Sequence, residues 1–391
     1  MAQARKKILC IFGTRPEAIK LAPVIVELKK HPNWFSIKSV ITSQHKEMLL
    51  QVLRQFDIPA DYDLNIMRPN QTLSQIVVRC LEGLPAVFEK EKPDMILVQG
   101  DTTTVFAAAF SAFCHKILIG HVEAGLRTFN KFNPYPEEVN RVLTGHMADL
   151  HFAPTLRSKF NLLKENIAQK SIFVTGNSVI DALLMTVEKK IDFRKYGLGF
   201  VDKEKRKLVL VTTHRRESFG CPMQQTCRAL KKLAQEFEKE IYVVLPVHKN
   251  PKVQEVVFKF LSDISNIHLV EPLEYFPFAF LMKKSFFILT DSGGVQEEAP
   301  SLGKPVLVLR ETTERPEAVK SGTVKLVGTN ADKIYGLAKR LLCSEVFYKS
   351  MQKPVNPYGD GKASQRMAFI LAHYFGFVRS LPKEFKGEKN A

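Results

Sequence analysis

Residues 286–316 read FFILTDSGGVQEEAPSLGKPVLVLRETTERP, and this stretch decides the fold of the second half of the chain. The apolar runs at 286–290 and 306–309 have the length of buried strands, and a helical segment lies between them. An Asp-Ser-Gly-Gly turn at 291–294 opens that helix, and its two glycines let a ligand approach the backbone closely. The N–H groups and the dipole at a helix N-terminus favour an anion. The stretch therefore predicts a strand–turn–helix cradle for a diphosphate.

Two further residues support a ligand site at this turn. Glu298 lies one turn into the helix, where it is placed to accept hydrogen bonds from ribose hydroxyls, and Arg315 follows the second strand. Glycine-rich turns between strand and helix are common in α/β proteins, so the turn alone leaves a purely structural interpretation open. The sharp helix stop at Ala299-Pro300 and the Arg after the next strand favour the binding site.

The composition is that of a two-domain globular protein. The chain has 391 residues, of which 45% are hydrophobic and 25% charged, and this length exceeds one ordinary core. No apolar run approaches the ~18 residues that span a bilayer, and the basic N-terminus leads directly into a strand, so we expect a cytoplasmic protein. The six scattered cysteines lack metal-ligand spacing, so we expect reduced thiols and no metal site.

The formal net charge of +17 has two explanations. One is nucleic-acid binding. Against it, Lys and Arg are spread along the chain and no nucleic-acid-binding motif is present. We therefore expect a basic surface around a site for an anionic small molecule, with neither nucleic acid nor membrane as a partner.

Strands and helices alternate along both halves of the chain. Candidate strands lie at 7–12, 36–42, 95–99, 116–122, 150–153 and 172–175, and then at 207–213, 241–246, 267–270, 286–290, 306–309 and 324–327. Repeated strand–helix units with right-handed crossovers predict parallel sheets covered on both faces. We expect an α/β protein with two Rossmann-like, doubly wound domains, 1–185 and 186–360, facing a central cleft. We expect a helix at 361–378 to cross back to the first domain and 379–391 to form a flexible basic tail.

Ligands bind beyond the carboxyl ends of the strands in open α/β sheets, and this rule selects the candidate site residues. Arg15 and Lys20 follow the first strand, in a segment where Thr14 and Glu17 have capping-box spacing. Capping requires neither basic residue. A second Arg at the same kind of junction is Arg315, and both arginines suit phosphate oxygens.

Three carboxylates follow strands of the first half. Asp101 comes after 95–99, Glu123 ends the next strand, and Glu137 starts a later helix. Asp101 has a structural explanation as a helix N-cap, and Glu137 has one as a favourable charge near a helix N-terminus. Glu123 ends an apolar strand, where poor solvation would raise its pKa. Together at one rim they predict acid–base chemistry, because close carboxylates cannot all ionise easily.

The second half adds three candidates. His214 follows the strand at 207–213 in the polar company of two arginines, and His248 ends the next strand as a weaker candidate. Phe278 lies just before the cradle, where it could pack against a base. The chain has no P-loop, no G-x-G-x-x-G fingerprint and no G-x-S-x-G elbow, which disfavours P-loop ATP hydrolysis, nicotinamide chemistry and a serine esterase.

Seven motifs together resemble the non-hydrolysing UDP-N-acetylglucosamine 2-epimerases. They are GTRPEAIKLAP (13–23), QGDTTT (99–104), HVEAGLRT (121–128), PYPEEVNR (134–141), TTHRRE (212–217), PVHKNP (246–251) and LTDSGGVQEEAPSLGKPVLVLRETTERPEAV (289–319). The resemblance extends to about residue 375. It implies the glycosyltransferase-B fold with the active site between two Rossmann-like domains. It also implies reversible conversion of UDP-N-acetylglucosamine to UDP-N-acetylmannosamine through a bound 2-acetamidoglucal, without a cofactor, for cell-surface polysaccharide synthesis.

Roles for individual residues follow from the resemblance. Asp101, Glu123 and Glu137 match the catalytic carboxylates, without a decision on which is acid and which is base. His214 matches a histidine that would stabilise departing UDP, and Phe278 matches a residue near uracil. The positions that match UDP contacts are Arg15, Lys20, Ser292, Gly293, Gly294, Glu298 and Arg315.

The chain departs from the family pattern at two places. Leu273 stands where a Gln is common in the uracil-side loop. Bacterial members can bind a second UDP-N-acetylglucosamine as an activator, and Gln44 and His45 match that loop as candidate allosteric residues. However, Asn70 stands where a basic residue is usual, so the match to the activator site is partial.

Three alternatives to the epimerase remain open. A hydrolysing relative would release N-acetylmannosamine and UDP by the same glycal route. A glycosyltransferase of the same fold would not need three carboxylates. A non-catalytic UDP-sugar sensor would not need Asp101, Glu123 and Glu137 together. The resemblance also implies a homodimer.

Overall fold

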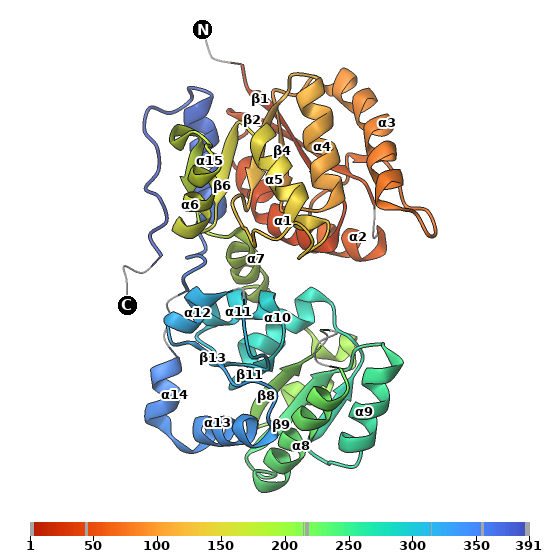
Figure 1. Cartoon of the computed structure of the whole chain (residues 1–391), viewed down its shortest axis with the longest axis vertical. Helices are drawn as coiled ribbons and strands as arrows, with labels where there is room; N and C mark the ends of the chain where they lie inside the picture. The colour runs from red at the N-terminus through yellow and green to blue at the C-terminus, as the bar shows by residue number, and fades with distance from the viewer. Residues whose placement is uncertain are drawn as a thin grey trace. The chain divides into compact units, whose positions relative to one another are not determined.

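The computed structural model describes residues 4–43, 46–213, 215, 219–313, 315–352 and 356–387. The chain divides into two compact units (Figure 1). Unit 1 contains the chain up to Ala182 together with Tyr358–Gly387, and unit 2 contains Leu183–Pro357. The chain therefore leaves unit 1 within a helix and returns to it near the C-terminus.

Unit 1 is built on a parallel seven-stranded sheet of order β3-β2-β1-β4-β5-β6-β7. Its strands are β1 Lys6–Phe12, β2 Phe35–Ile41, β3 Tyr62–Asp63, β4 Met95–Gln99, β5 Leu118–Val122, β6 Leu150–Ala153 and β7 Ile172–Val174. Its helices are α1 Arg15–Lys29, α2 Lys46–Gln55, α3 Leu73–Glu91, α4 Thr103–Cys114, α5 Glu137–Met147, α6 Leu156–Lys164, the short η1 Gln169–Ser171 and α15 Ala363–Tyr374; α7 Ser178–Val187 continues into unit 2.

The strand order divides the helices of unit 1 between two faces. From β1 the chain proceeds to β2 and β3 on one side, whereas from β4 it proceeds to β5, β6 and β7 on the other. Right-handed crossovers then place α1 and α2 on the face opposite α4, α5 and α6. Contacts agree with this division, since α1 packs against α2 and α15 while α4 packs against α3 and α5.

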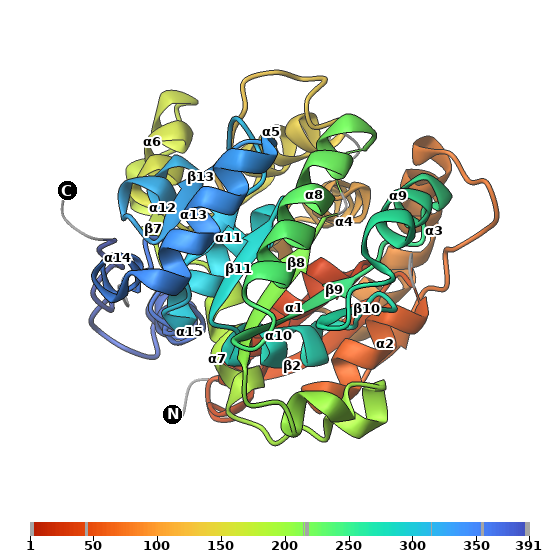
Figure 2. The same ribbon diagram turned by 90° about the horizontal axis from the view of Figure 1, so that it is seen from below.

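Unit 2 repeats the design with a parallel six-stranded sheet of order β10-β9-β8-β11-β12-β13. Its strands are β8 Lys207–Thr212, β9 Ile241–Pro246, β10 Ile267–Val270, β11 Phe287–Thr290, β12 Val306–Val308 and β13 Val324–Leu326. Its helices are η2 Phe193–Tyr196, η3 Gly199–Asp202, α8 Cys221–Glu236, α9 Pro251–Leu261, α10 Tyr275–Lys284, α11 Gly293–Glu298, η5 Ala299–Leu302, α12 Pro316–Lys320, α13 Ala331–Cys343 and α14 Glu345–Met351. Figure 2 shows α8 and α13 side by side, and these two helices close one hydrophobic core over the sheet.

The predicted strands are present in both sheets, each within about two residues of its expected bounds. The fold is therefore α/β with two Rossmann-like domains, as predicted. The prediction missed β3, because a two-residue strand leaves no periodic signal. No helix in the described part of the chain is both long and apolar enough to cross a membrane.

The C-terminal segment differs from the expected flexible tail. The backbone N–H of Phe385 donates to Val174 O at 2.8 Å, and the carboxylate of Glu384 accepts the N–H of Val174 at 3.1 Å. The ring of Phe385 is buried. The segment thus covers the edge of β7, whose backbone groups would otherwise lack partners.

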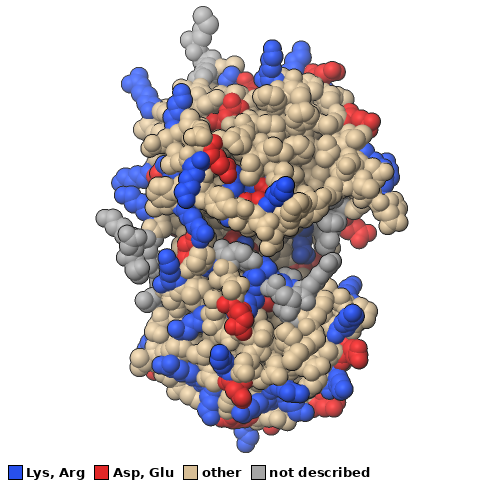
Figure 3. Space-filling model, viewed as in Figure 1, with Lys and Arg blue, Asp and Glu red and all other residues tan. Residues whose placement is uncertain are grey.

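Charged side chains are distributed over the surface. Figure 3 shows Lys and Arg spread over the visible face, with Asp and Glu among them. On this face, basic residues are mixed with acidic ones, as expected from Lys and Arg that are spread along the sequence.

Candidate active site

The switch point of the unit 1 sheet lies between β1 and β4, which are paired neighbours. Ligands of doubly wound sheets bind at such a point, beyond the carboxyl ends of the strands. The loop after β1 leads to Arg15, which is partly buried, and the loop after β4 carries Asp101. Glu17 joins these loops, because it accepts the backbone N–H of Thr14 at 2.7 Å and the hydroxyl of Thr102 at 3.0 Å.

Glu17 is an unusual carboxylate for a helix start. Its residue is only 1% exposed, and burial raises its pKa from 4.5 to about 7, although hydrogen bonds from Thr14 and Thr102 oppose that rise. The capping role of Glu17 was predicted, but its link to Thr102 across the switch point was not. The link fixes the two strand-end loops relative to each other.

Glu123 is held by donors from three different elements. The ammonium of Lys20, on α1, lies 2.6 Å from Oε2. Gln99, at the end of β4, donates to Oε2 at 2.5 Å, and Asn177, just before α7, donates to Oε1 at 2.9 Å. All three donors are N–H groups, which suits a carboxylate that accepts rather than donates hydrogen bonds.

The backbone of Glu123 adopts a left-handed conformation. Its φ is 65°, in the left-handed region that a non-glycine residue adopts at a cost of order 1–3 kcal/mol. Such strain persists where the surrounding structure over-determines it, and it concentrates at active sites. Lys20, predicted as a phosphate contact, lies on this carboxylate in the structure.

Asp101 pairs with Arg141 of α5. Nη2 of Arg141 lies 2.6 Å from Oδ2 of Asp101, and the side-chain amide of Asn140 donates to the backbone oxygen of Asp101 at 2.9 Å. The N-cap of α4 is Thr102, so capping does not explain Asp101. Burial raises the pKa of Asp101, Arg141 lowers it, and the nearby Glu123 raises it again.

Glu137 is the partly buried first residue of α5. Its negative charge also raises the pKa of Asp101, as a smaller cause than burial or Arg141. Asp101 therefore interacts electrostatically with both Glu123 and Glu137, so the structure brings the three predicted carboxylates together. The next residue, Glu138, has a different role, because its carboxylate accepts the backbone N–H groups of residues 128 and 129 and shapes the preceding loop.

The glycine-rich turn of unit 2 lies at the second switch point, between β8 and β11. Ser292 caps α11, and Gly293 and Gly294 form its first turn. A β-carbon on Gly293 would lie 2.6 Å from Nη1 of Arg315, so a side chain here would displace the guanidinium from its position over the turn. Arg315 also donates from Nε to Glu297 at 2.6 Å. The turn and the Arg that were predicted separately are thus in contact.

Asp291 and the predicted Glu298 flank the same turn in the sequence, and the predicted Phe278 lies on α10. Asp291 is fully buried and accepts the backbone N–H of Arg215 at 3.0 Å, which joins the loops after β8 and β11. Glu298 is buried beside Tyr275, where burial first and then the charge of Glu298 raise the pKa of Tyr275 well above 10.0. Phe278 is partly buried on α10.

Three predicted residues lie outside the described part of the chain: His214 and the candidate allosteric pair Gln44 and His45. The weaker candidate His248 is exposed, and its Nδ1 accepts the backbone N–H of Asn250 at 3.1 Å. That contact gives His248 a role in the local turn.

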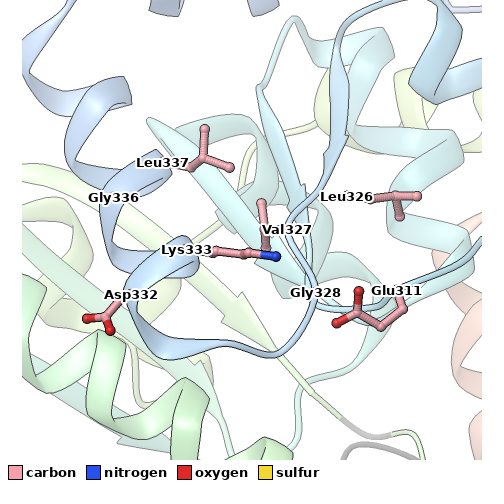
Figure 4. A pocket seen from close by; sticks show the side chains of 8 residues that line it. All are labelled: Glu311, Leu326, Val327, Gly328, Asp332, Lys333, Gly336 and Leu337. Atoms are coloured by element: carbon pink, nitrogen blue, oxygen red, sulfur yellow. The ribbon is translucent and has the colours of Figure 1, made fainter.

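A pocket of about 460 Å³ lies beside β12 and β13 of unit 2. Figure 4 shows Glu311 and Lys333 on two sides of it, with Gly328 between them. Gly328 has a φ of 69°, a conformation that favours glycine, and the carboxylate of the exposed Glu311 lies beside it. The pocket lies two strands from the β8–β11 switch point, so we do not assign the ligand to it. Among the described residues, no three His, Cys, Asp or Glu side chains are arranged to hold a metal ion.

Sequence reasoning missed several polar residues of unit 1. Arg141 has the helical i, i+4 spacing from Glu137, a pattern that normally indicates only a surface ion pair. Gln99 ends an apolar strand, and Asn177 precedes a helix as an ordinary cap. The strand-end rule would have found Gln99, but no local signal separates these residues from structural ones.

Comparison with known proteins identifies the family of the chain. The family model described as UDP-N-acetylglucosamine 2-epimerase matches residues 26–372. The UDP-N-acetylglucosamine 2-epimerase of Bacillus subtilis is 53% identical over 383 residues, which cover 98% of this chain and 99% of that protein. A crystal structure of a UDP-N-acetylglucosamine 2-epimerase superimposes with a TM-score of 0.91 at 50% identity, covering 98% of this chain and 100% of that one.

A third relative carries a ligand. The Neisseria meningitidis UDP-N-acetylglucosamine 2-epimerase, solved with UDP-N-acetylglucosamine bound, has a TM-score of 0.81 and 49% identity, covering 93% of this chain and 99% of that chain. These matches confirm the resemblance of the sequence motifs. The chain belongs to the UDP-N-acetylglucosamine 2-epimerase family of isomerases.

Proposed function

We propose that the protein interconverts UDP-N-acetylglucosamine and UDP-N-acetylmannosamine reversibly, without net hydrolysis. The observation that carries the proposal is that Asp101, Glu123 and Glu137, which follow the neighbouring strands β4 and β5, lie close enough for the charges of Glu123 and Glu137 to raise the pKa of Asp101. Epimerisation at C2 requires removal of a proton on one face of the sugar and its return on the other. Carboxylates in unlike environments supply such an acid and base at one pH.

The environments of two carboxylates suggest a division of roles. Glu123 accepts N–H donors from Lys20, Gln99 and Asn177, so we assign it the role of base that takes the C2 proton. The C2–H electron pair then forms the C1–C2 double bond, and the C1–O pair leaves with UDP. The raised pKa of Asp101 suits a group that returns a proton to C2 when UDP adds back to C1.

Unit 2 is proposed to retain UDP while it is detached. The backbone N–H groups of Gly293 and Gly294 and the guanidinium of Arg315 suit a diphosphate, whereas the N–H of Ser292 donates to the hydroxyl of Thr290 at 2.9 Å, so Ser292 would contact UDP through its side chain. Glu298 is assigned to the ribose hydroxyls and Phe278 to uracil. A leaving group that stays bound can add back to the glycal, and this retention separates an epimerase from a hydrolase.

Proton NMR of UDP-N-acetylglucosamine with the purified protein in deuterated water tests the proposal. We expect UDP-N-acetylmannosamine with deuterium at C2, and UDP that remains mostly attached to sugar. Equal amounts of free N-acetylmannosamine and UDP would instead indicate the hydrolysing class. UDP binding without exchange would favour a sensor and refute the roles of the carboxylates.

We also propose a homodimer, as the family resemblance implies. Phe110 and Phe113 are exposed on α4, and Val139 and Leu143 are exposed on the adjoining α5. Neighbouring apolar side chains on two packed helices suit a protein interface. Analytical ultracentrifugation of the wild type and of the double variant Phe110→Ser, Phe113→Ser tests this proposal. We expect the double variant to contain more monomer than the wild type. If both proteins are equally dimeric, the interface lies elsewhere.

A further inference from the structure

Asn177 contacts the carboxylate of Glu123 and begins one of the two segments that connect unit 1 to unit 2. The chain leaves unit 1 after Ala182, within α7, and returns at Tyr358. We call residues 177–182 and 358–364 the crossing segments. Asn177 begins the first of them and is 3% exposed.

The side chain of Asn177 has a different partner at each end of its amide. Nδ2 donates to Oε1 of Glu123 at 2.9 Å, and Oδ1 accepts the backbone N–H of Val179 at 3.1 Å. Because one end donates and the other accepts, the two contacts fix the orientation of the amide. Asn177 therefore caps the first turn of α7 and holds the carboxylate with one planar group.

The two crossing segments are bonded to each other at this point. The N–H of Asn177 donates to Tyr358 O at 2.6 Å, and Asp181 accepts the N–H of Ser364 at 2.8 Å. A β-carbon on Gly359 would lie 3.2 Å from the carbonyl oxygen of Asn177. A displacement of the crossing segment 358–364 toward Asn177 therefore moves Asn177, because the two are in contact.

We propose that Asn177 is a positioning residue that couples the geometry of the crossing segments to the orientation of the Glu123 carboxylate. The inference rests on the proposed function, in which Glu123 takes the C2 proton. Of the three donors to this carboxylate described above, Lys20 belongs to α1 and Gln99 to β4, whereas Asn177 belongs to a crossing segment. A movement of the crossing segments therefore changes the orientation of the Glu123 carboxylate through its hydrogen bond with Asn177.

The variant Asn177→Ser separates positioning from helix capping. Serine caps a helix about as well as asparagine, but its side chain is too short to reach Glu123. We expect unchanged UDP affinity and a modest loss of thermal stability, because the buried Glu123 carboxylate loses a donor, with C2 deuterium exchange slowed about tenfold, the equivalent of one hydrogen bond to a charged group. A merely structural role would lower stability and UDP affinity together and would leave the pH dependence of exchange unchanged.

The pH profile gives a second readout of the same variant. Loss of a donor that stabilises the ionised carboxylate moves the titration of Glu123 upward, so the acid limb of the exchange rate should shift to higher pH. Among the described residues, the ionisable groups that interact with Glu123 include Lys20 from α1, Asp101 after β4 and His121 within β5. The substitution changes none of them, so the shift reports on Asn177.

The variant Gly359→Ala tests the coupling from the other crossing segment. Its β-carbon would press on Asn177 and lie 2.9 Å from Cγ1 of Ile180. We expect exchange to slow several-fold in the wild-type background and to change no further in Asn177→Ser. Gly336→Ala is the matched control, because no atom lies within 4 Å of its built β-carbon. A double-mutant cycle measures the coupling directly.

Each outcome decides the inference separately from the proposed function. Equal pH profiles of Asn177→Ser and wild type would overturn the positioning role, and additive effects of Gly359→Ala and Asn177→Ser would overturn the coupling. If the wild type exchanges no proton, the proposed function fails. In that case an NMR titration of the Glu123 carboxyl ¹³C signal, which is assigned by its absence in Glu123→Gln, still tests the role of Asn177. A titration midpoint at higher pH in Asn177→Ser than in wild type supports the positioning role, and an unchanged midpoint overturns it.

Discussion

Replacing Glu17 with Gln should remove a pH-dependent component of the stability of unit 1. Burial raises the pKa of Glu17 from 4.5 to about 7, so the folded state holds a proton that the unfolded chain releases between these values. The associated stability is fully present below pH 4.5 and is lost as pH rises through 7. The difference between the two pKa values corresponds to about 3 kcal/mol of unfolding free energy.

Gln can make the same contacts without a charge. Its side-chain oxygen can accept the N–H of Thr14, and its amide can donate to the hydroxyl of Thr102. The stability of Glu17→Gln relative to wild type should therefore rise by about 3 kcal/mol between pH 4.5 and pH 8. In a unit of roughly 200 residues this corresponds to a gain of about 6–12 °C in Tm relative to wild type.

Differential scanning calorimetry of both proteins at a series of pH values from 4.5 to 8 measures this effect. Only the difference between the two proteins is used, so contributions from other titrating groups cancel. Glu17→Ala is the control, because it loses the contacts with Thr14 and Thr102 and should lower Tm at every pH. Parallel curves for wild type and Glu17→Gln would refute the raised pKa and the reasoning from burial.

Two substitutions probe the remaining parts of the site. Gly293→Ala would place a β-carbon 2.6 Å from Nη1 of Arg315, so UDP affinity by isothermal titration calorimetry should fall at least tenfold, whereas Gly336→Ala, which lies outside the turn and has no atom within 4 Å of an added β-carbon, should retain affinity; an unchanged affinity of Gly293→Ala would count against the Arg315 guanidinium as a UDP contact. Arg141→Met removes the positive charge that lowers the pKa of Asp101, so this pKa should rise further and the basic limb of the pH profile of kcat should move to higher pH, with a lower kcat. An unshifted basic limb would count against Asp101 as the acid.

The fold was predictable because buried parallel strands leave a strong local signal. Runs such as 95–99 and 306–309 are continuously apolar, and the turns after them carry glycine and proline. The missing strand, β3, has two residues and pairs only at the sheet edge, with β2. The docking of the segment near Phe385 was also missed, because its partner is the β7 edge, which is distant in sequence.

The reactive groups of the site were predictable, but most of the residues that hold them were not. Asp101 and Glu123 follow strands, so a topological rule selects them without knowledge of contacts. Gln99 and Asn177 act through hydrogen bonds to Glu123, and neither residue type is unusual where it occurs. Their role depends on which strands are neighbours, so it becomes visible only in three dimensions.

The two sheets fix their switch points by the same physical means. In unit 1 the buried Glu17 accepts N–H and O–H donors from the loops after β1 and β4, and in unit 2 the buried Asp291 accepts the N–H of Arg215 from the loop after β8. A buried carboxylate that bridges two loops holds their spacing, because breaking either contact leaves a desolvated charge or donor at a cost of about 1–3 kcal/mol. That spacing determines where an anionic ligand meets the strand ends. The capping residue Glu17 and the Asp of the Asp-Ser-Gly-Gly turn therefore belong to the architecture of the site as well as to the local structure that first identifies them.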